Sequence, residues 1–151
     1  MAVYSFMNFT CSVVGPGLIA DLGFGAAVAE EGVTIELEGD KNTLTMGADG
    51  EGMHNLHAAK NGILTVRLLK TSPTNSVLSV AYAAQTTSPL LHGLNVFVIR
   101  DPNRGDIISA RNGAFKKMTN LVFAKDGGMN EWRFDVIKVD VVLGNGNPGL
   151  I

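Results

Sequence analysis

Apolar and polar residues alternate through most of this chain, with the two-residue period of a half-buried β-strand. The alternation is clearest at residues 33–37, 43–46 and 64–68. Turn-forming residues at 39–42 separate the first two segments and predict that these segments pair as a hairpin. Residues 96–99 form a continuous apolar run, which is typical of a strand covered on both faces. The pattern therefore predicts a chain built mainly from antiparallel sheet.

The last predicted strand changes phase along its length. Its apolar residues lie at even positions from Trp132 to Val136 and at odd positions from Ile137 to Leu143. A shift of one residue exchanges the two faces of a strand, and a β-bulge or a sharp bend is the usual device. We expect this strand to leave one sheet and join another in a sandwich or barrel.

Three further segments are assigned from local pattern. Residues 107–118 are predicted as one strand interrupted at Asn112-Gly113, and residues 121–124 as a short strand. Residues 47–61 are predicted as a long connection that forms an inserted loop or a short helix.

One segment has a helical pattern. Ser72 is a plausible N-cap with Pro73 at the first helical position, and the helix is expected to end near Gln85. The face expected to point inward carries Val77, Leu78, Ala81, Tyr82 and Ala84. The predicted fold is a single domain, residues 1–151, with an antiparallel β-sandwich or barrel of roughly seven to nine strands and one flanking helix.

Charge and cysteine content narrow the class of protein. Only 17% of the residues are charged and 46% are hydrophobic, which favours a surface that a partner subunit covers. The net charge of −2 does not steer the chain toward nucleic acid or a membrane. Cys11 is the only cysteine, so no intrachain disulfide can form. We expect neither a signal peptide nor a membrane span.

No residue pattern points to catalysis, a cofactor or a metal. His54 and His57 lie three residues apart, but no cysteine or second acidic pair lies nearby. Cys11 is expected to be a small packing residue. The glycine-rich segments at 15–17 and 23–25 lack the spacing and the lysine of a phosphate loop. The basic-aromatic segments at 115–117 and 132–133 are too weakly charged to indicate nucleic-acid binding.

Several stretches resemble, in order, a family of structural proteins of contractile-tailed bacteriophages. The most specific is Ala124-Lys125-Asp126-Gly127-Gly128-Met129-Asn130-Glu131-Trp132. The other matching stretches are residues 29–36, 40–43, 47–50, 53–58, 66–73 and 115–117. The resemblance runs from about Val3 to about Gly146 and indicates a tail tube protein.

The resemblance implies a fold similar to the tube protein of type VI secretion, with six copies in a ring and inner sheets merged into a 24-stranded barrel. It implies stacked rings inside a contractile sheath, and a channel through which phage DNA leaves without sequence-specific binding. The implied partners are the protein itself and the tail sheath, tape measure and baseplate proteins. The implied location is the phage tail, assembled in the host cytoplasm.

Two sets of residues are assigned roles in such a tube. Met53, His54, Leu56 and His57 are expected to contact a neighbouring subunit, because their connection is more apolar than a solvated loop needs. Glu36, Glu38 and Asp40 are expected to face the channel, where carboxylates would not retain DNA. A position on a solvated outer face explains these carboxylates equally well.

Other functions stay open at the level of sequence. The chain could be the tube subunit of a headless contractile injection particle, or another tail or baseplate component of the same fold. A soluble β-barrel that binds a small ligand or an oligonucleotide is the alternative from a different class, and it predicts a monomer with an open groove.

Overall fold

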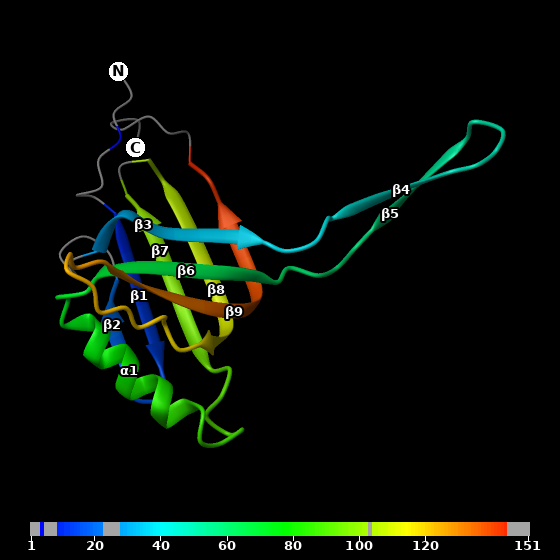
Figure 1. The fold of residues 1–151 in the computed structure, drawn as a ribbon. Coiled ribbons are helices and arrows are strands. Elements are labelled where there is room, and N and C mark those ends of the chain that lie inside the picture. The colour runs from blue at the N-terminus through cyan, green and yellow to red at the C-terminus, as the bar shows by residue number, and fades with distance from the viewer. Residues whose placement is uncertain (1–3, 5–8, 23–27, 103, 145–151) are drawn as a thin grey trace.

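The computed structural model describes residue 4 and residues 9–22, 28–102 and 104–144. They form nine strands and one helix (Figure 1). In chain order these are β1 (Thr10–Gly15), β2 (Leu18–Asp21), β3 (Val28–Leu37), β4 (Asn42–Met46), β5 (Gly52–Leu56), β6 (Gly62–Leu69), α1 (Thr74–Gln85), β7 (Asn95–Asp101), β8 (Asp106–Lys117) and β9 (Met129–Val142).

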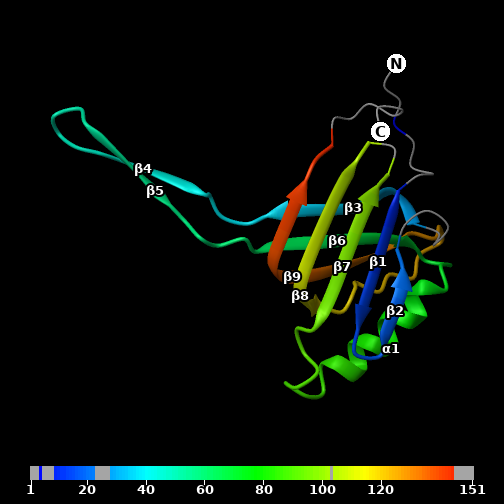
Figure 2. The ribbon, with the colours of Figure 1, turned by 180° about the vertical axis from the view of Figure 1, so that it is seen from behind.

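Seven strands form one antiparallel sheet in the order β2-β1-β7-β8-β9-β6-β3, and β4 and β5 form a separate two-stranded sheet. The large sheet folds over into two layers, with β3 and β6 crossing β1, β7 and β8 (Figures 1 and 2). This confirms the predicted mainly β fold with a single flanking helix.

Strand β9 connects the two layers. It pairs with β6 through Met129–Val136 and with β8 as far as Val142, and it bends sharply between these parts (Figure 1). The buried side chains change phase at the bend, from Val136 to Val139. The predicted change of face is therefore confirmed, and its cause is a strand shared by both layers.

The predicted hairpin between residues 33–37 and 43–46 is wrong. Strand β3 pairs with β6, with Ile35 opposite Leu64, and β4 pairs with β5, with Leu44 opposite His54. The turn residues at 39–42 do break the strand, but the chain continues away from the body instead of reversing. The predicted connection at 47–61 accordingly contains a strand, β5.

Two other strand predictions differ from the structure. Strand β7 is buried only on alternate residues, because Phe97 is in the core while Val96 and Val98 are partly exposed on the other face. Residues 121–124 form no strand and their apolar side chains are exposed. Residues 106–117 form one strand, β8, and the predicted interruption at Asn112-Gly113 is a bulge within it, where Asn112 has a positive φ of 57°.

Helix α1 begins one turn after β6 and packs beside β2 (Figure 1). Ser72 Oγ accepts a hydrogen bond from the backbone N–H of Thr74 at 3.3 Å, and Pro73 already has helical φ and ψ. The buried side chains are Leu78, Ala81 and Gln85. The expected inward face was therefore partly wrong, because Val77 and Ala84 are exposed and Gln85 is buried.

Aromatic rings fill the space between the layers. Phe115 lies 4.6 Å from Phe134 and 5.9 Å from Trp132, measured between ring centroids, and Phe97 lies 4.7 Å from Phe134. Since Phe115 and Trp132 are core residues, they cannot form an exposed basic-aromatic patch with the lysines beside them. No helix in the described part of the chain is long and apolar enough to cross a membrane.

Candidate functional site

The β4–β5 hairpin is an arm that projects from the body, and its two strands pair with each other and with no strand of the seven-stranded sheet (Figure 1). Five residue pairs hold it together, from Asn42 opposite Leu56 to Met46 opposite Gly52. At its tip the side chain of Asp49 accepts the backbone N–H of Glu51 at 3.1 Å, and Gly50 has the positive φ of 90° that closes the turn. The arm thus has its own hydrogen bonding but no hydrophobic core.

One face of the arm is apolar. Residues directly opposite each other share a face, so Leu44, Met46 and Leu56 lie on the same side. A Cβ on Gly52 would lie 2.8 Å from Met46 Sδ and 3.5 Å from Leu44 Cδ1, so these two side chains cover the glycine. Their exposed fractions are 55% for Leu44, 57% for Met46 and 87% for Leu56. This apolar arm face has no partner among the described residues.

The other face of the arm is largely polar. Asn55 Nδ2 donates to Thr43 O at 2.9 Å and to Thr45 Oγ1 at 3.0 Å, and Thr43 Oγ1 lies 2.7 Å from His57 Nε2. Met53, opposite Thr45, is the apolar exception. Both faces are exposed to solvent.

The structure places all four predicted interface residues on or beside the arm, but divides them between its faces. His54 and Leu56 belong to the apolar face, and Met53 and His57 to the polar one. Leu44 and Met46 also lie on the apolar arm face, where they were not expected because the pattern placed them in a hairpin with residues 33–37. The alternation of Leu44, Met46 and Leu56 was the signal that could have found them.

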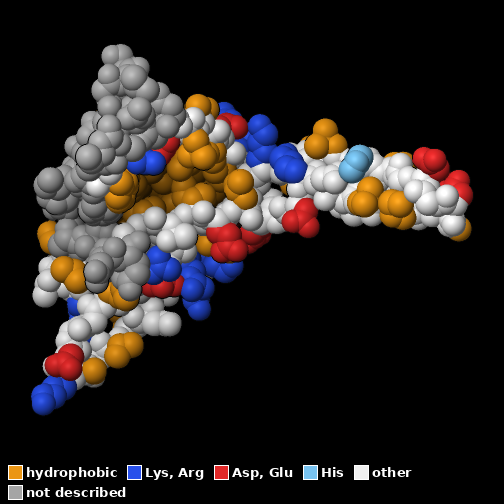
Figure 3. Space-filling view, turned by 90° about the horizontal axis from the view of Figure 1, so that it is seen from above, with side chains coloured by type: hydrophobic (Ala, Val, Ile, Leu, Met, Phe, Trp, Pro, Cys, Tyr) orange, Lys and Arg blue, Asp and Glu red, His pale blue; other side chains and the backbone are white. Residues whose placement is uncertain are grey.

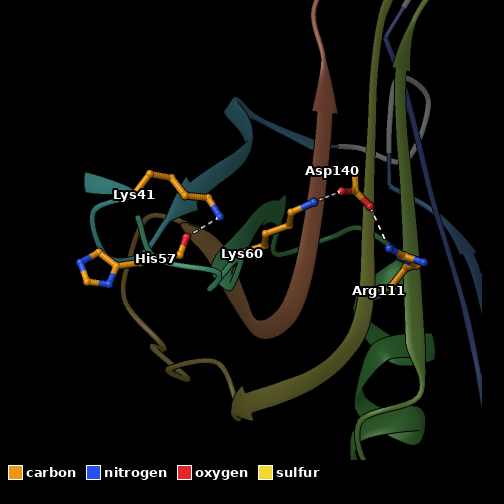
Figure 4. Close-up of polar contacts among 5 residues, drawn as sticks. All are labelled: Lys41, His57, Lys60, Arg111 and Asp140. Atoms are coloured by element: carbon orange, nitrogen blue, oxygen red, sulfur yellow. Dashed lines mark hydrogen bonds and ion pairs between the residues drawn. The ribbon is translucent and has the colours of Figure 1, made fainter. Parts of the chain in front are cut away.

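The base of the arm is joined to the sheet by an ion-pair cluster (Figure 4). Asp140 accepts Lys60 Nζ at 3.3 Å on one carboxylate oxygen and Arg111 Nη2 at 2.9 Å on the other. The hydrogen bond and charge of Lys60, followed by the charge of Arg111, hold the pKa of Asp140 below its usual value. Val139 N–H also donates to Lys60 O at 2.9 Å. Lys60 is therefore fixed to β9 by both backbone and side chain.

The predicted channel residues lie at the end of β3 and in the segment that leads from β3 into β4. Glu36 is exposed on β3, and Glu38 follows that strand and accepts a hydrogen bond from Asn61 Nδ2 at 3.1 Å. Asp40 is exposed just before β4. Their orientation toward a channel stays a prediction.

Exposed apolar side chains also gather elsewhere on the body (Figure 3). The segment 74–94 contains no charged residue, and its exposed side chains include Val80, Leu90 and Leu94. In the loop between β8 and β9, Phe123 is exposed under the Lys70 ammonium, 3.9 Å from the ring centroid. Such surfaces are typical of a subunit that partners cover.

The side chains that could bind a metal ion do not cluster in the described part of the chain. Within the described residues, no three His, Cys, Asp or Glu side chains are placed to hold a metal ion. Cys11 is buried in β1, and that burial, with the negative charge of Asp21, raises the pKa of its thiol to about 12. Cys11 is thus a packing residue, as predicted. The glycine-rich segment 23–25 lies outside the described residues.

Solved structures with the same fold come from contractile injection systems. The chain is similar to one in the cryo-EM structure of the sheath–tube complex of PVC, an extracellular contractile injection system, in its extended state (11% identity, 92% of this chain and 90% of that chain covered, TM-score 0.60). It is also similar to a chain of the 6-fold symmetrised baseplate of the anti-feeding prophage (9% identity, 96% and 98% covered, TM-score 0.61). A chain of the PVC sheath/tube terminator in its extended state is similar too (13% identity, 94% and 98% covered, TM-score 0.56).

At these identities the structural likeness establishes the fold alone. No curated protein matches the sequence. Residues 1–144, however, match the family model described as the bacteriophage PhiTE tail tube protein. An open β-sandwich with a projecting arm agrees with that match. The chain belongs to the bacteriophage PhiTE tail tube protein family.

Proposed function

We propose that this tail tube protein forms hexameric rings that stack into a hollow tube inside a contractile sheath, and that the tube conducts phage DNA during ejection. The β4–β5 arm makes the contact between copies. In this proposal the protein acts through its shape and its assembly, without catalysis.

The observation that carries the proposal is the exposed apolar face of the arm. A two-stranded hairpin is marginally stable at best in water by itself. This one adds an uncovered row of Leu44, Met46 and Leu56. Burying three such side chains against a neighbour would contribute about 1.5–3 kcal/mol each. The arm therefore gains most of its stability only when a second copy covers it.

The edges of the large sheet give a second argument. Strands β2 and β3 end the sheet order, so among the described residues no strand pairs with the outer side of either. In the described part of the chain, the second half of β9 pairs only with β8, apart from the bridge at Lys60. Unpaired edges favour strand addition, and a closed ring removes them by pairing each edge with a neighbour.

We propose that the carboxylates of Glu36, Glu38 and Asp40 face the channel. Each is exposed, and a wall of this charge would not hold the DNA backbone through counterion release. Tail sheath, tape measure and baseplate proteins are the proposed partners, with assembly in the host cytoplasm. The exposed surfaces of α1 and of residues 121–123 are available for such contacts.

Electron microscopy of the purified protein tests the assembly. The wild type is expected to form rings and hollow tubes at high concentration. A variant that lacks residues 41–58 keeps the pair between Glu38 N and Asn61 O and leaves Gly39, Asp40, Ala59 and Lys60 as the loop. It is expected to fold, as judged by circular dichroism, and to form no tubes. Tubes built by the deletion variant would refute the role of the arm.

A matched pair of variants separates the two faces of the arm. Leu44→Ser with Leu56→Ser removes the apolar face and is expected to abolish tubes. Thr45→Ser with Asn55→Ser changes the polar residues of the opposite face and is expected to leave them. A strict monomer at every concentration, for the wild type, would instead favour a soluble binding module.

A further inference from the structure

We propose that the acidic tip of one arm binds the basic pocket at the base of the arm of a second copy. This inference rests on the proposed function, because it requires that copies assemble through their arms. It names the docking site and the occupant, which the apolar arm face by itself does not.

The docking site is a shallow pocket of about 480 Å³ where the arm base meets β8 and β9. It is lined by Ala58, Ala59, Lys60, Arg111, Ile137 and Lys138. The two alanines leave its mouth uncrowded, and the three cationic side chains are exposed. We call this set the base pocket.

The charges of the base pocket are not balanced within the subunit. Arg111 and Lys138 are directly opposite on β8 and β9, an arrangement that destabilises a strand pair when the charges are alike. Lys60 adds a third cation through its bridge to Lys138. The carboxylate paired with these cations is Asp140, which contacts Lys60 and Arg111. Three cations less one anion leave two positive charges for an external anion to neutralise.

The tip of the arm carries the complementary charge. Asp49 and Glu51 flank Gly50 in the turn, and acidic side chains stand at the far end of the arm (Figure 3). The Asp49 carboxylate is ordered by the backbone N–H of Glu51. These two carboxylates match the two uncompensated positive charges.

The length of the arm suits contact between successive copies. Residues 51–60 run from the tip to the base, and at about 3.3 Å per extended residue they span roughly 30 Å. A tip therefore cannot reach the base pocket of its own chain. If successive copies in a stack are spaced by about the length of one arm, the tip of each arm reaches the base of the arm on the next copy.

A carboxylate tip fits the pocket better than a DNA phosphate. Asp140 lies between Lys60 and Arg111 and would repel a phosphodiester chain that follows the sheet. A tip presents only two carboxylates, on a short turn, and can place them beside Lys138 and Arg111 without crossing Asp140. DNA in the base pocket is the competing outcome of the test.

Cysteine cross-linking tests the contact directly. Chains with both Glu51→Cys and Lys138→Cys, assembled into tubes and oxidised, are expected to give a ladder of covalent oligomers on a non-reducing gel. Chains with either change alone are expected to stay monomeric. The buried Cys11 does not interfere. The matched control replaces Glu51→Cys by Asp126→Cys in the loop between β8 and β9, and no ladder is expected.

Charge reversal gives an independent readout. Glu51→Lys and Lys138→Glu are each expected to raise the protein concentration needed for tubes at least tenfold, and the double variant to restore it. Asp126→Lys is expected to change nothing. Two results would overturn this inference and leave the proposed function standing. In the first, the double cysteine variant forms normal tubes but gives no ladder of cross-linked oligomers. In the second, Lys138→Glu forms intact tubes that retain less DNA. A wild type that never assembles would overturn both.

Discussion

The side-chain amides of Gln85 and Asn95 form a reciprocal pair inside the protein. Gln85 Nε2 donates to Asn95 Oδ1 at 2.9 Å, and Asn95 Nδ2 donates to Gln85 Oε1 at 2.7 Å. Gln85 Nε2 also donates to Pro16 O at 3.0 Å. Both residues are buried, so one polar contact joins the end of α1, the start of β7 and the β1–β2 turn.

Breaking this pair is expected to destabilise the subunit. Asn95→Ala leaves the buried amide of Gln85 without its main partner, which costs about 1–3 kcal/mol in the free energy of unfolding. Urea unfolding of Asn95→Ala, of Gln85→Ala and of the double variant measures the coupling free energy between the two amides. Asn120→Ala, an exposed control, should stay within about 0.5 kcal/mol of the wild type. Additive single effects would show that the two amides do not act together.

The inward face of α1 is tested by neighbouring residues. Leu78→Ala removes a fully buried side chain and is expected to lower the free energy of unfolding by about 2–5 kcal/mol. Val77→Ala is the control, because Val77 is 41% exposed and alanine is the better helix former. Its effect should stay within about 0.5 kcal/mol. Equal losses for both variants would mean that the helix is rotated from the position described.

The ion-pair cluster predicts a pH dependence. Because the pKa of Asp140 is lowered in the folded state, its contribution to stability is full above the unfolded value of 3.8. That contribution is lost as the pH falls through the lowered folded pKa. The wild type should therefore unfold at a higher temperature than Asp140→Asn at pH 6, and this difference should vanish in stronger acid. High salt should reduce the difference at pH 6, since the pairs are partly exposed.

Cys11 is expected to be inert in the folded protein. With a pKa of about 12 its thiol carries almost no thiolate at pH 8, and burial also blocks reagents. A thiol-reactive dye should label it only in denaturant. Ser12→Cys supplies the control, because residue 12 is exposed on the same strand and its thiol should react at once. Rapid labelling of the native wild type would contradict the burial of Cys11.

The parts of the fold that sequence could predict depend on local pattern. The phase change in β9, the start of α1 at Ser72 and Pro73, and the interruption at Asn112 each leave a signature within a few residues. All three are present in the structure. The resemblance to a known family placed these elements together in one fold, which local pattern alone could not do.

Pairing partners could not be predicted in the same way. The alternation in β3 and β4 is the same whether they pair with each other or separately with β6 and β5. The choice depends on long-range packing, since β3 packs Val33 and Ile35 against the core whereas β4 is exposed along its whole length. Gln85 was missed for a related reason, because a glutamine is inward only where a distant amide, Asn95, receives it. The base pocket likewise brings Lys60 to Asp140 and Arg111 across distant strands.

Strand β9 also determines how the subunit bears load. Because one unbroken backbone segment runs through both layers, tension along β9 passes between the layers through covalent bonds. For one layer to slide past the other, the hydrogen bonds between β9 and β6, or those between β9 and β8, would have to break together. These hydrogen bonds would share the load in parallel. A sandwich whose layers met only through apolar side chains would yield at that contact at a much lower force. In the proposed tube, such subunits would resist twist and stretch through their peptide chains, and the proposed arm contacts would be the compliant joints.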